Sequence, residues 1–187
     1  LNENHTLKGG ADLILDSVQM ESSLWSQKKE GEFFRNPFED EINADFEESF
    51  FTPSIYLMDQ MTFGKLVVVP GCNILYDRHN GSAYADPRLT IKYKLKERMT
   101  LKMATGLYSK LPPPDENYEP WGTENLRPER SIHLVAGVEH RFSDALSMDL
   151  QGYYKDFFDS VVRIDENDPT AYGNEGEGRA YGGELFL

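Results

Sequence analysis

The residues best suited to ligand chemistry lie close together between residues 110 and 128. Glu116 and Glu119 alternate there with Tyr118 and Trp121. The two aromatic rings can stack on a sugar or an aromatic chelate, and the carboxylates can accept hydrogen bonds from it. The pattern predicts a ligand-binding loop. The alternative is a loop that packs its aromatic side chains upon itself.

Other chemistry-bearing residues do not combine into a catalytic or metal site. His133 and His140 share one predicted strand, but they are seven residues apart and so lie on opposite faces. Ser54 and Ser131 have no context in the sequence that would activate a nucleophile. Segment 20–50 is acidic and could attract Ca²⁺, but it has no EF-hand spacing, so a solvated charged surface is the other interpretation. We therefore predict no catalytic residue, metal site or cofactor, and no enzyme.

Composition excludes several classes of protein. The chain has 19 basic and 32 acidic side chains and a net charge of -13, which argues against a nucleic-acid partner because phosphate binding requires a basic surface. The mean hydropathy is -0.57, and no apolar run approaches the roughly 18 residues of a spanning helix. The single cysteine, Cys72, leaves no internal disulfide.

Most of the chain alternates between apolar and polar residues, as β-strands do. Leu89, Ile91 and Tyr93 fall on one face and Thr90 and Lys92 on the other. Several such segments approach the roughly 9–11 residues that a tilted strand needs to cross a bilayer. The pattern predicts eight strands, at residues 6–19, 51–62, 65–78, 86–96, 98–109, 129–142, 145–159 and 172–187.

The predicted strands are joined alternately by short turns and by mostly longer polar loops. This wiring is typical of an outer-membrane β-barrel, so we expect an all-β, antiparallel transmembrane β-barrel wall. Three local details accompany this expectation. The segment from Asn36 to Phe50 forms a short helix or an irregular loop, Pro70 suggests a bulge, and the outward face of 55–61 is not determined by the sequence.

Several short motifs occur in an order that is similar to a known family. The most specific are the Asn-Leu-Arg-Pro-Glu stretch at 125–129 and the Gly-Gly-Glu-Leu ending at 182–185. They follow Asp86-Pro87-Arg88 and a Gly-Leu-Tyr-Ser-Lys-Leu-Pro-Pro run at 106–113. In this order, over roughly residues 5–187, the chain resembles the barrel of TonB-dependent outer-membrane receptors.

The resemblance implies about eight meandering strands of a barrel of roughly 22 strands with a plugged lumen. Residues 1–187 would then be an internal fragment of one barrel domain, with the plug domain and signal peptide absent from this chain. The resemblance implies the cell outer membrane as location and lipid, a metal chelate of siderophore type and a periplasmic TonB-type energy transducer as partners. The ligand would be captured by extracellular loops and imported.

Three other interpretations stay open at this point. A stand-alone outer-membrane barrel could serve as an adhesin or a structural protein. A barrel enzyme such as a protease or lipase would need an acid, base and nucleophile set that is not visible here. A soluble β-sandwich would bury one strand face against a second sheet.

Overall fold

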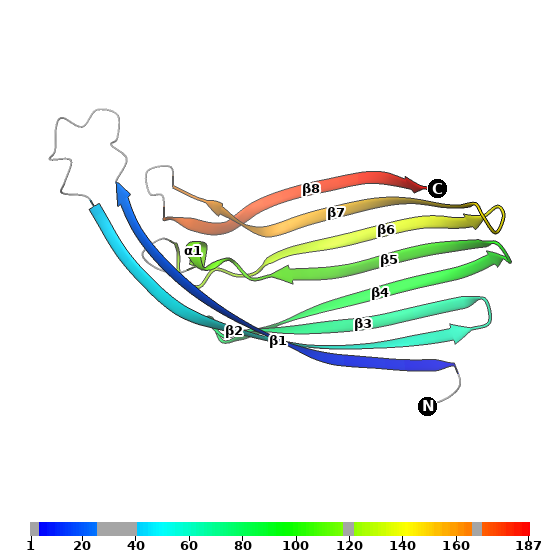
Figure 1. Cartoon of the computed structure of the whole chain (residues 1–187), viewed down its shortest axis with the longest axis horizontal. Coiled ribbons are helices and arrows are strands. Elements are labelled where there is room, and N and C mark those ends of the chain that lie inside the picture. Colours follow the sequence, from blue (N-terminus) through cyan, green and yellow to red (C-terminus); the bar gives the residue numbers. More distant parts are fainter. Residues whose placement is uncertain (1–3, 26–40, 118–121, 166–169) are drawn as a thin grey trace.

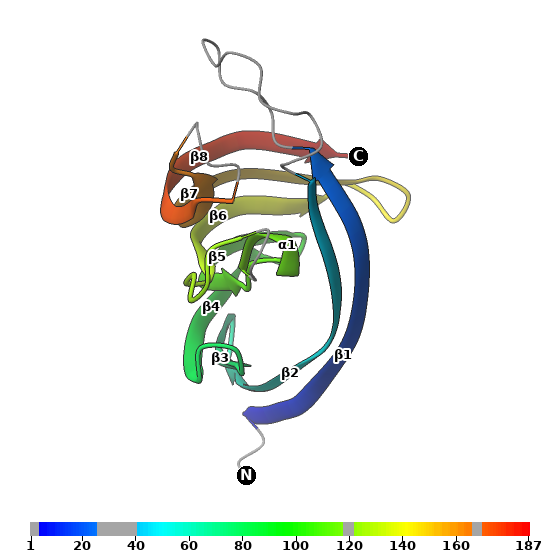
Figure 2. The same ribbon diagram turned by 90° about the vertical axis from the view of Figure 1, so that its left-hand side faces the viewer.

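The chain forms one antiparallel sheet of eight strands in sequence order, β1-β2-β3-β4-β5-β6-β7-β8. We analysed a computed structural model, which describes residues 4–25, 41–117, 122–165 and 170–187. The sheet curves into a trough, with the short helix α1 on its concave side (Figures 1 and 2). The predicted all-β antiparallel barrel wall is therefore confirmed.

All eight predicted strands are present, and most ends agree to within a few residues. The elements are β1 (His5–Trp25), β2 (Glu41–Phe63), β3 (Leu66–Asp77), β4 (Ser82–Lys96), β5 (Met99–Lys110), α1 (Pro114–Asn117), β6 (Glu129–Arg141), β7 (Ser147–Arg163) and β8 (Tyr172–Phe186). Within the described ranges, no helix is long and apolar enough to cross a membrane. Short turns follow β2, β4 and β6 at one end of the sheet, the short-turn end; the opposite end is the long-loop end (Figure 1).

The first two strands extend much further than the sequence indicates. Strand β1 runs to Trp25 and pairs there with Glu41 at the start of β2. The helix or irregular loop expected up to Phe50 is therefore wrong for residues 41–50, and residues 36–40 lie outside the described chain. The expected helix rested on apolar residues four apart. Four is also an even number, so the same residues fit one face of a strand.

Cross-strand register places the apolar residues of neighbouring strands side by side. Val68 pairs with Ile91, Ile91 with Met103, and Met103 with Ala136. No second sheet lies over this row in the described structure, and the Met103 side chain is 59% exposed. A soluble sandwich would bury such a face, so that interpretation does not fit this sheet.

The face that carries the polar residues is the concave one. Asp16 of β1 and Asp77 of β3 line one cavity together with Asn117 of α1, and α1 lies in the hollow of the trough (Figure 2). Because side chains alternate along a strand, the apolar row lies on the convex face. A convex apolar face and a concave polar face are what a membrane barrel requires.

Pairing settles the face of β2 that the sequence left undetermined. Leu57 pairs with Cys72 and Ile55 with Ile74, so the odd-numbered residues of this segment share the convex face. Asp59 has the same parity, and its Oδ2 lies 2.7 Å from Nδ1 of His5. The contact gives one oxygen of this carboxylate a hydrogen-bond partner, whereas its buried Oδ1 has none among the described residues.

Pro70 does not cause the predicted bulge. Met58 pairs with Gly71 and Met61 with Val68, in the same register on both sides of the proline. The pairing with β2 is only interrupted there, because proline carries no N–H to donate. The pairing of β3 with β4 continues through Pro70 without a shift.

The concave face near the short-turn end carries ion pairs. The Lys102 ammonium contacts the carboxylate of Asp149 and lies 3.8 Å from that of Glu139. Gln151 donates a hydrogen bond of 3.0 Å to Glu184 on the next strand. Charged groups that lie in rows across the four strands β5 to β8 are typical of a wetted or plugged lumen rather than a packed core.

Candidate ligand-binding mouth

The long connection between β5 and β6 carries three consecutive prolines directly after its first residue, Leu111. Pro112, Pro113 and Pro114 have no N–H, so they cannot continue the β5 ladder beyond Lys110. Pro114 is also the first residue of α1, a position where proline is favoured because its missing N–H has no helical partner. The proline run therefore ends the strand and starts a four-residue helix.

Within this connection, the backbone of residues 122–123 contacts the backbone of residue 116. The Thr123 N–H donates to the Glu116 carbonyl oxygen at 2.9 Å. A Cβ atom at Gly122 would lie 2.1 Å from the same oxygen, so only glycine fits this approach. The buried Asn117 accepts a hydrogen bond of 3.0 Å from the Leu126 N–H. These contacts give the loop a defined fold.

Of the four predicted binding residues, the structure describes only Glu116. It lies in α1 on the concave side of the sheet, half-buried. Tyr118, Glu119 and Trp121 lie outside the described residues. Their role as a ligand-binding group is therefore still a prediction.

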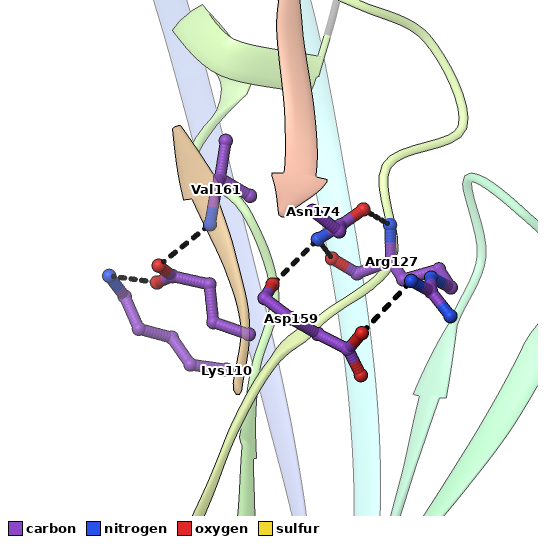
Figure 3. A network of polar contacts seen from close by, with 6 residues as sticks. Lys110, Arg127, Asp159, Val161 and Asn174 are labelled. Carbon is purple, nitrogen blue, oxygen red and sulfur yellow. Dashed lines mark hydrogen bonds and ion pairs between the residues drawn. The ribbon is translucent and has the colours of Figure 1, made fainter. Parts of the chain in front are cut away.

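Three residues, Arg127, Asp159 and Asn174, tie this loop to the hairpin of β7 and β8; we call them the clamp (Figure 3). The Asn174 amide group donates at 2.8 Å to the Arg127 and Asp159 carbonyl oxygens, and its Oδ1 accepts from the Arg127 N–H at 2.8 Å. The Arg127 guanidinium lies 2.9 Å from the Asp159 carboxylate. The clamp therefore joins segments of the chain that are up to 47 residues apart.

The backbone of β7 is bent at the clamp. Asp159 has φ of 54°, in the left-handed region, which aspartate tolerates better than most residues. The register between β7 and β8 shifts between Phe157 and Ser160, as at a β-bulge. The bulge accompanies the turn of the Asp159 carbonyl toward Asn174.

Two further side chains strengthen the same junction. Glu129, the first residue of β6, accepts from the Val161 N–H at 3.2 Å and lies 3.2 Å from the Lys110 ammonium (Figure 3). Thr123 accepts from the Tyr172 N–H at 2.8 Å and donates to the Thr170 carbonyl at 3.2 Å. Loop 122–128 is thus held against β7 and β8 along its length.

Asp86 fills a gap where β4 and β5 separate. The described pairing of these strands begins at Arg88 and Gly106. Beyond that point the Asp86 carboxylate, only 2% exposed, accepts from the N–H and the hydroxyl of Ser109 at 3.1 and 2.7 Å. The side chain takes the place of ladder hydrogen bonds, which explains a buried carboxylate in the motif noted at 86–88.

Aromatic and basic side chains of β4, β5 and β6 form a row across the concave face near the long-loop end. The Arg88 guanidinium lies 4.5 Å from the centre of the Tyr108 ring. That ring stacks on His133, with 4.3 Å between centroids. His133 lies on the concave face and His140 belongs to the opposite parity, in agreement with the predicted separation of the two histidines.

The sequence indicated neither the clamp nor the buried Asp77. Residues 125–129 were recognised as a motif without a role, and no local pattern points from Arg127 to residues 32 and 47 positions away. The position of Asp77 could have been predicted, because it is an odd-numbered residue of β3 and the odd-numbered residues of this strand lie on the concave face.

Comparison with known proteins shows the same architecture. Residues 4–187 match the family described as "TonB dependent receptor-like, beta-barrel". The siderophore receptor PirA from Pseudomonas aeruginosa superposes with a TM-score of 0.74 at 19% identity, covering 97% of this chain and 32% of that one. No curated protein matches this chain significantly.

Two further solved structures agree. A mutant of the ferric enterobactin receptor PfeA from Pseudomonas aeruginosa has a TM-score of 0.77 at 19% identity, over 97% of this chain and 30% of that one. The FrpB iron transporter from Neisseria meningitidis has a TM-score of 0.72 at 14% identity, over 99% and 31%. The match to the family over residues 4–187, on a sheet with a convex apolar and a concave polar face, shows that this chain belongs to the TonB-dependent receptors, within their β-barrel.

Proposed function

We propose that this chain is part of the wall of an outer-membrane receptor that imports a nutrient such as a metal chelate. The chain spans about a third of the length of the solved receptors it matches, so uptake is a property of a larger protein. The observation that carries the proposal is the division of one sheet into a convex apolar face and a concave charged face. An apolar face that nothing else in the described structure covers, backed by a charged face, is what a wall between lipid and an aqueous or plugged lumen requires.

In this proposal the convex face contacts outer-membrane lipid, and the short-turn end faces the periplasm. The long-loop end then lies outside the cell, where Glu116, Tyr118, Glu119 and Trp121 would meet the cargo. The clamp supports this role because it fixes the adjoining segment 122–128. Binding residues held by rigid surroundings lose less conformational entropy when the ligand arrives.

Passage through the barrel requires no covalent chemistry. Cargo would cross the lumen past the charged concave face after a plug, contributed by another part of the protein, is displaced. A periplasmic TonB-type transducer would supply the energy for that displacement. The cargo class is suggested by the solved neighbours, which are named a siderophore receptor, a ferric enterobactin receptor and an iron transporter.

Uptake by cells tests the proposal. Cells lacking the full-length protein that carries this sequence are compared with complemented cells for import of a panel of radiolabelled ferric chelates, with and without an active energy transducer. We expect energy-dependent import of at least one chelate only in complemented cells. Equal import of every chelate with and without the protein, together with loss of surface adhesion in the deletion strain, would instead support an adhesin.

A substitution in the clamp links the uptake to this chain. Arg127→Ala removes the ion pair to Asp159 and is expected to reduce import at unchanged surface amount of the protein. Arg141→Ala is the matched control, because Arg141 ends β6 at the short-turn end, far from the mouth.

A further inference from the structure

A bulge near the end of β4 turns one lysine onto the convex face at the short-turn end. The pairing of β4 with β5 shifts between Lys94, which opposes Thr100, and Lys96, which opposes Met99. Directly opposed residues of an antiparallel pair lie on the same face, and Met99 belongs to the convex series of β5 that includes Met103. Without the bulge, Lys96 would continue the concave series of Lys94. The bulge therefore re-aims this ammonium group toward the convex side.

Two further cations lie near Lys96. Arg98 follows in the same turn, and its guanidinium donates a hydrogen bond of 3.2 Å to the Phe142 carbonyl oxygen. Lys65 lies in the turn after β2, and its carbonyl oxygen accepts from the Lys94 N–H at 2.8 Å. The side chains of Lys65, Lys96 and Arg98 are exposed, and none forms an ion pair with a carboxylate in the described part of the chain. We call these three residues the basic corner.

The charge of the basic corner is opposite to that of the chain as a whole. The acidic residues in the turns after β2, β4 and β6 are Glu97 and Asp144, both exposed, so the three cations outnumber them. The whole chain, in contrast, carries 32 acidic and 19 basic side chains. A positive patch on an acidic protein favours an anionic partner at that place.

Exposed apolar side chains border the basic corner. Leu95, Phe142 and Leu146 all lie at the same end of the sheet with exposed side chains. The Phe142 ring contacts the His140 ring edge-to-face, with 4.4 Å between the centroids. Long basic side chains lay their apolar stems along such a surface and hold their charged ends in the adjoining polar layer. Cations at the rim of an apolar face therefore fit lipid headgroups, with the apolar residues against the acyl chains.

We propose that the basic corner binds the phosphate of an anionic phospholipid in the leaflet at the short-turn end. The inference rests on the proposed function, in which the convex face contacts lipid, and it assigns a lipid class to one corner of that face. Lys96 and Arg98 contact the phosphate from one turn and Lys65 from the next, while the acyl chains lie against Leu95 and Phe142. A zwitterionic lipid binds less well, because the basic corner repels its cationic group.

Quenching of a fluorophore by brominated lipids tests the inference at single sites. A bimane label on Leu101→Cys lies on the convex face near the basic corner, and one on Ile132→Cys lies on the same face near the long-loop end. Both are made in the full-length protein with Cys72 replaced by alanine, in vesicles of phosphatidylcholine with brominated phosphatidylglycerol or brominated phosphatidylcholine. At the Leu101 label we expect phosphatidylglycerol to bind about fivefold tighter than phosphatidylcholine, and at the Ile132 label equally well.

Lys96→Gln and Lys94→Gln are a matched pair of variants. Both remove one positive charge from the same end of β4, but only Lys96 lies on the convex face. Lys96→Gln should reduce the preference at the Leu101 label to about twofold or less, whereas Lys94→Gln and Lys96→Arg should keep it. The preference of the wild type should shrink in high salt, since salt screens exposed charges.

The outcomes separate this inference from the proposed function. A preference of equal size at both labels would overturn the inference, as would one that survives in Lys96→Gln, which would assign this cation to a protein contact. Equal quenching by the two lipids at both labels would overturn it too, but the convex face would still contact lipid and the receptor wall would stand. Absence of quenching by either lipid at both labels would contradict the proposed function as well.

Discussion

Replacing Asn174 with alanine removes three hydrogen bonds, two that hold loop 122–128 to the hairpin of β7 and β8 and one within that hairpin. Two of them go to the backbone of Arg127 and one to the carbonyl of Asp159. A hydrogen bond contributes about 0.5–1.5 kcal/mol net, and water can partly replace those at the exposed Arg127. We therefore expect the free energy of local opening of residues 122–128 to fall by about 1–2 kcal/mol.

Hydrogen exchange of the full-length protein in detergent measures this opening directly. A loss of about 1–2 kcal/mol corresponds to amide exchange about 5–30-fold faster in residues 122–128. The amides of Leu126 and Arg127, which donate to Asn117 and Asn174, report best. Exchange in β3 and β4 should stay unchanged.

Asn80→Ala is the matched control for Asn174→Ala. Asn80 accepts from the Ser82 N–H in the turn between β3 and β4, so its loss should accelerate exchange only in that turn. If Asn174→Ala leaves the exchange of 122–128 within about twofold of the wild type, these hydrogen bonds do not hold the loop and the clamp is wrongly assigned.

Two further changes test the wall itself. Gly137→Ala places a Cβ 2.6 Å from the Leu150 carbonyl oxygen and should lower the free energy of unfolding in urea by about 1–3 kcal/mol. In the control Gly152→Ala, the new Cβ has its nearest atom at 3.8 Å, so the free energy of unfolding should change little. Equal effects of the two substitutions would refute the packing argument. Lys102→Met leaves the carboxylate of Asp149 without its cation and should lower the thermal midpoint slightly, by an amount that shrinks in high salt; a difference that salt does not reduce would exclude an electrostatic cause.

Strand positions and faces could be predicted from the sequence because alternation is forced by the two environments of a barrel wall. Ile91 and Met103 lie on the convex face while Lys92 and Lys102 lie on the concave face, so apolar and polar residues alternate along β4 and β5. Where both faces carry similar side chains, as with Tyr56 beside Leu57, alternation does not identify the outward face. Only the pairing of β2 with β3 determines which residues are on the convex face.

The extension of β1 and β2 could not be predicted for the same reason. Residues 41–50 lie beyond the end of β3, where no alternation of apolar and polar side chains is required. Backbone pairing from Trp25 and Glu41 onward forms the strands there, and the apolar residues spaced four apart fit a helix as well as a strand.

The site was the least predictable part. The clamp connects Arg127 to Asp159 and Asn174 across 32 and 47 residues. A separate contact connects Asp86 to Ser109 across 23 residues. Such contacts depend on register and on bulges, which composition does not encode. Glu116 lies in the connection between β5 and β6, where the sequence indicated a loop, but its place in α1 on the concave side of the sheet was not predicted.

In the proposed function, the convex face contacts lipid while the concave face lines the lumen. Nitroxide labels placed one at a time from Ile132 to Gly137 in β6 of the full-length protein, with Cys72 replaced by alanine, test it in liposomes. We predict that collision with oxygen peaks at Ile132, Leu134 and Ala136, and that collision with a water-soluble nickel complex peaks at the residues between them. Accessibilities that rise and fall together, or a water-exposed label at Leu134, would contradict this assignment of the faces.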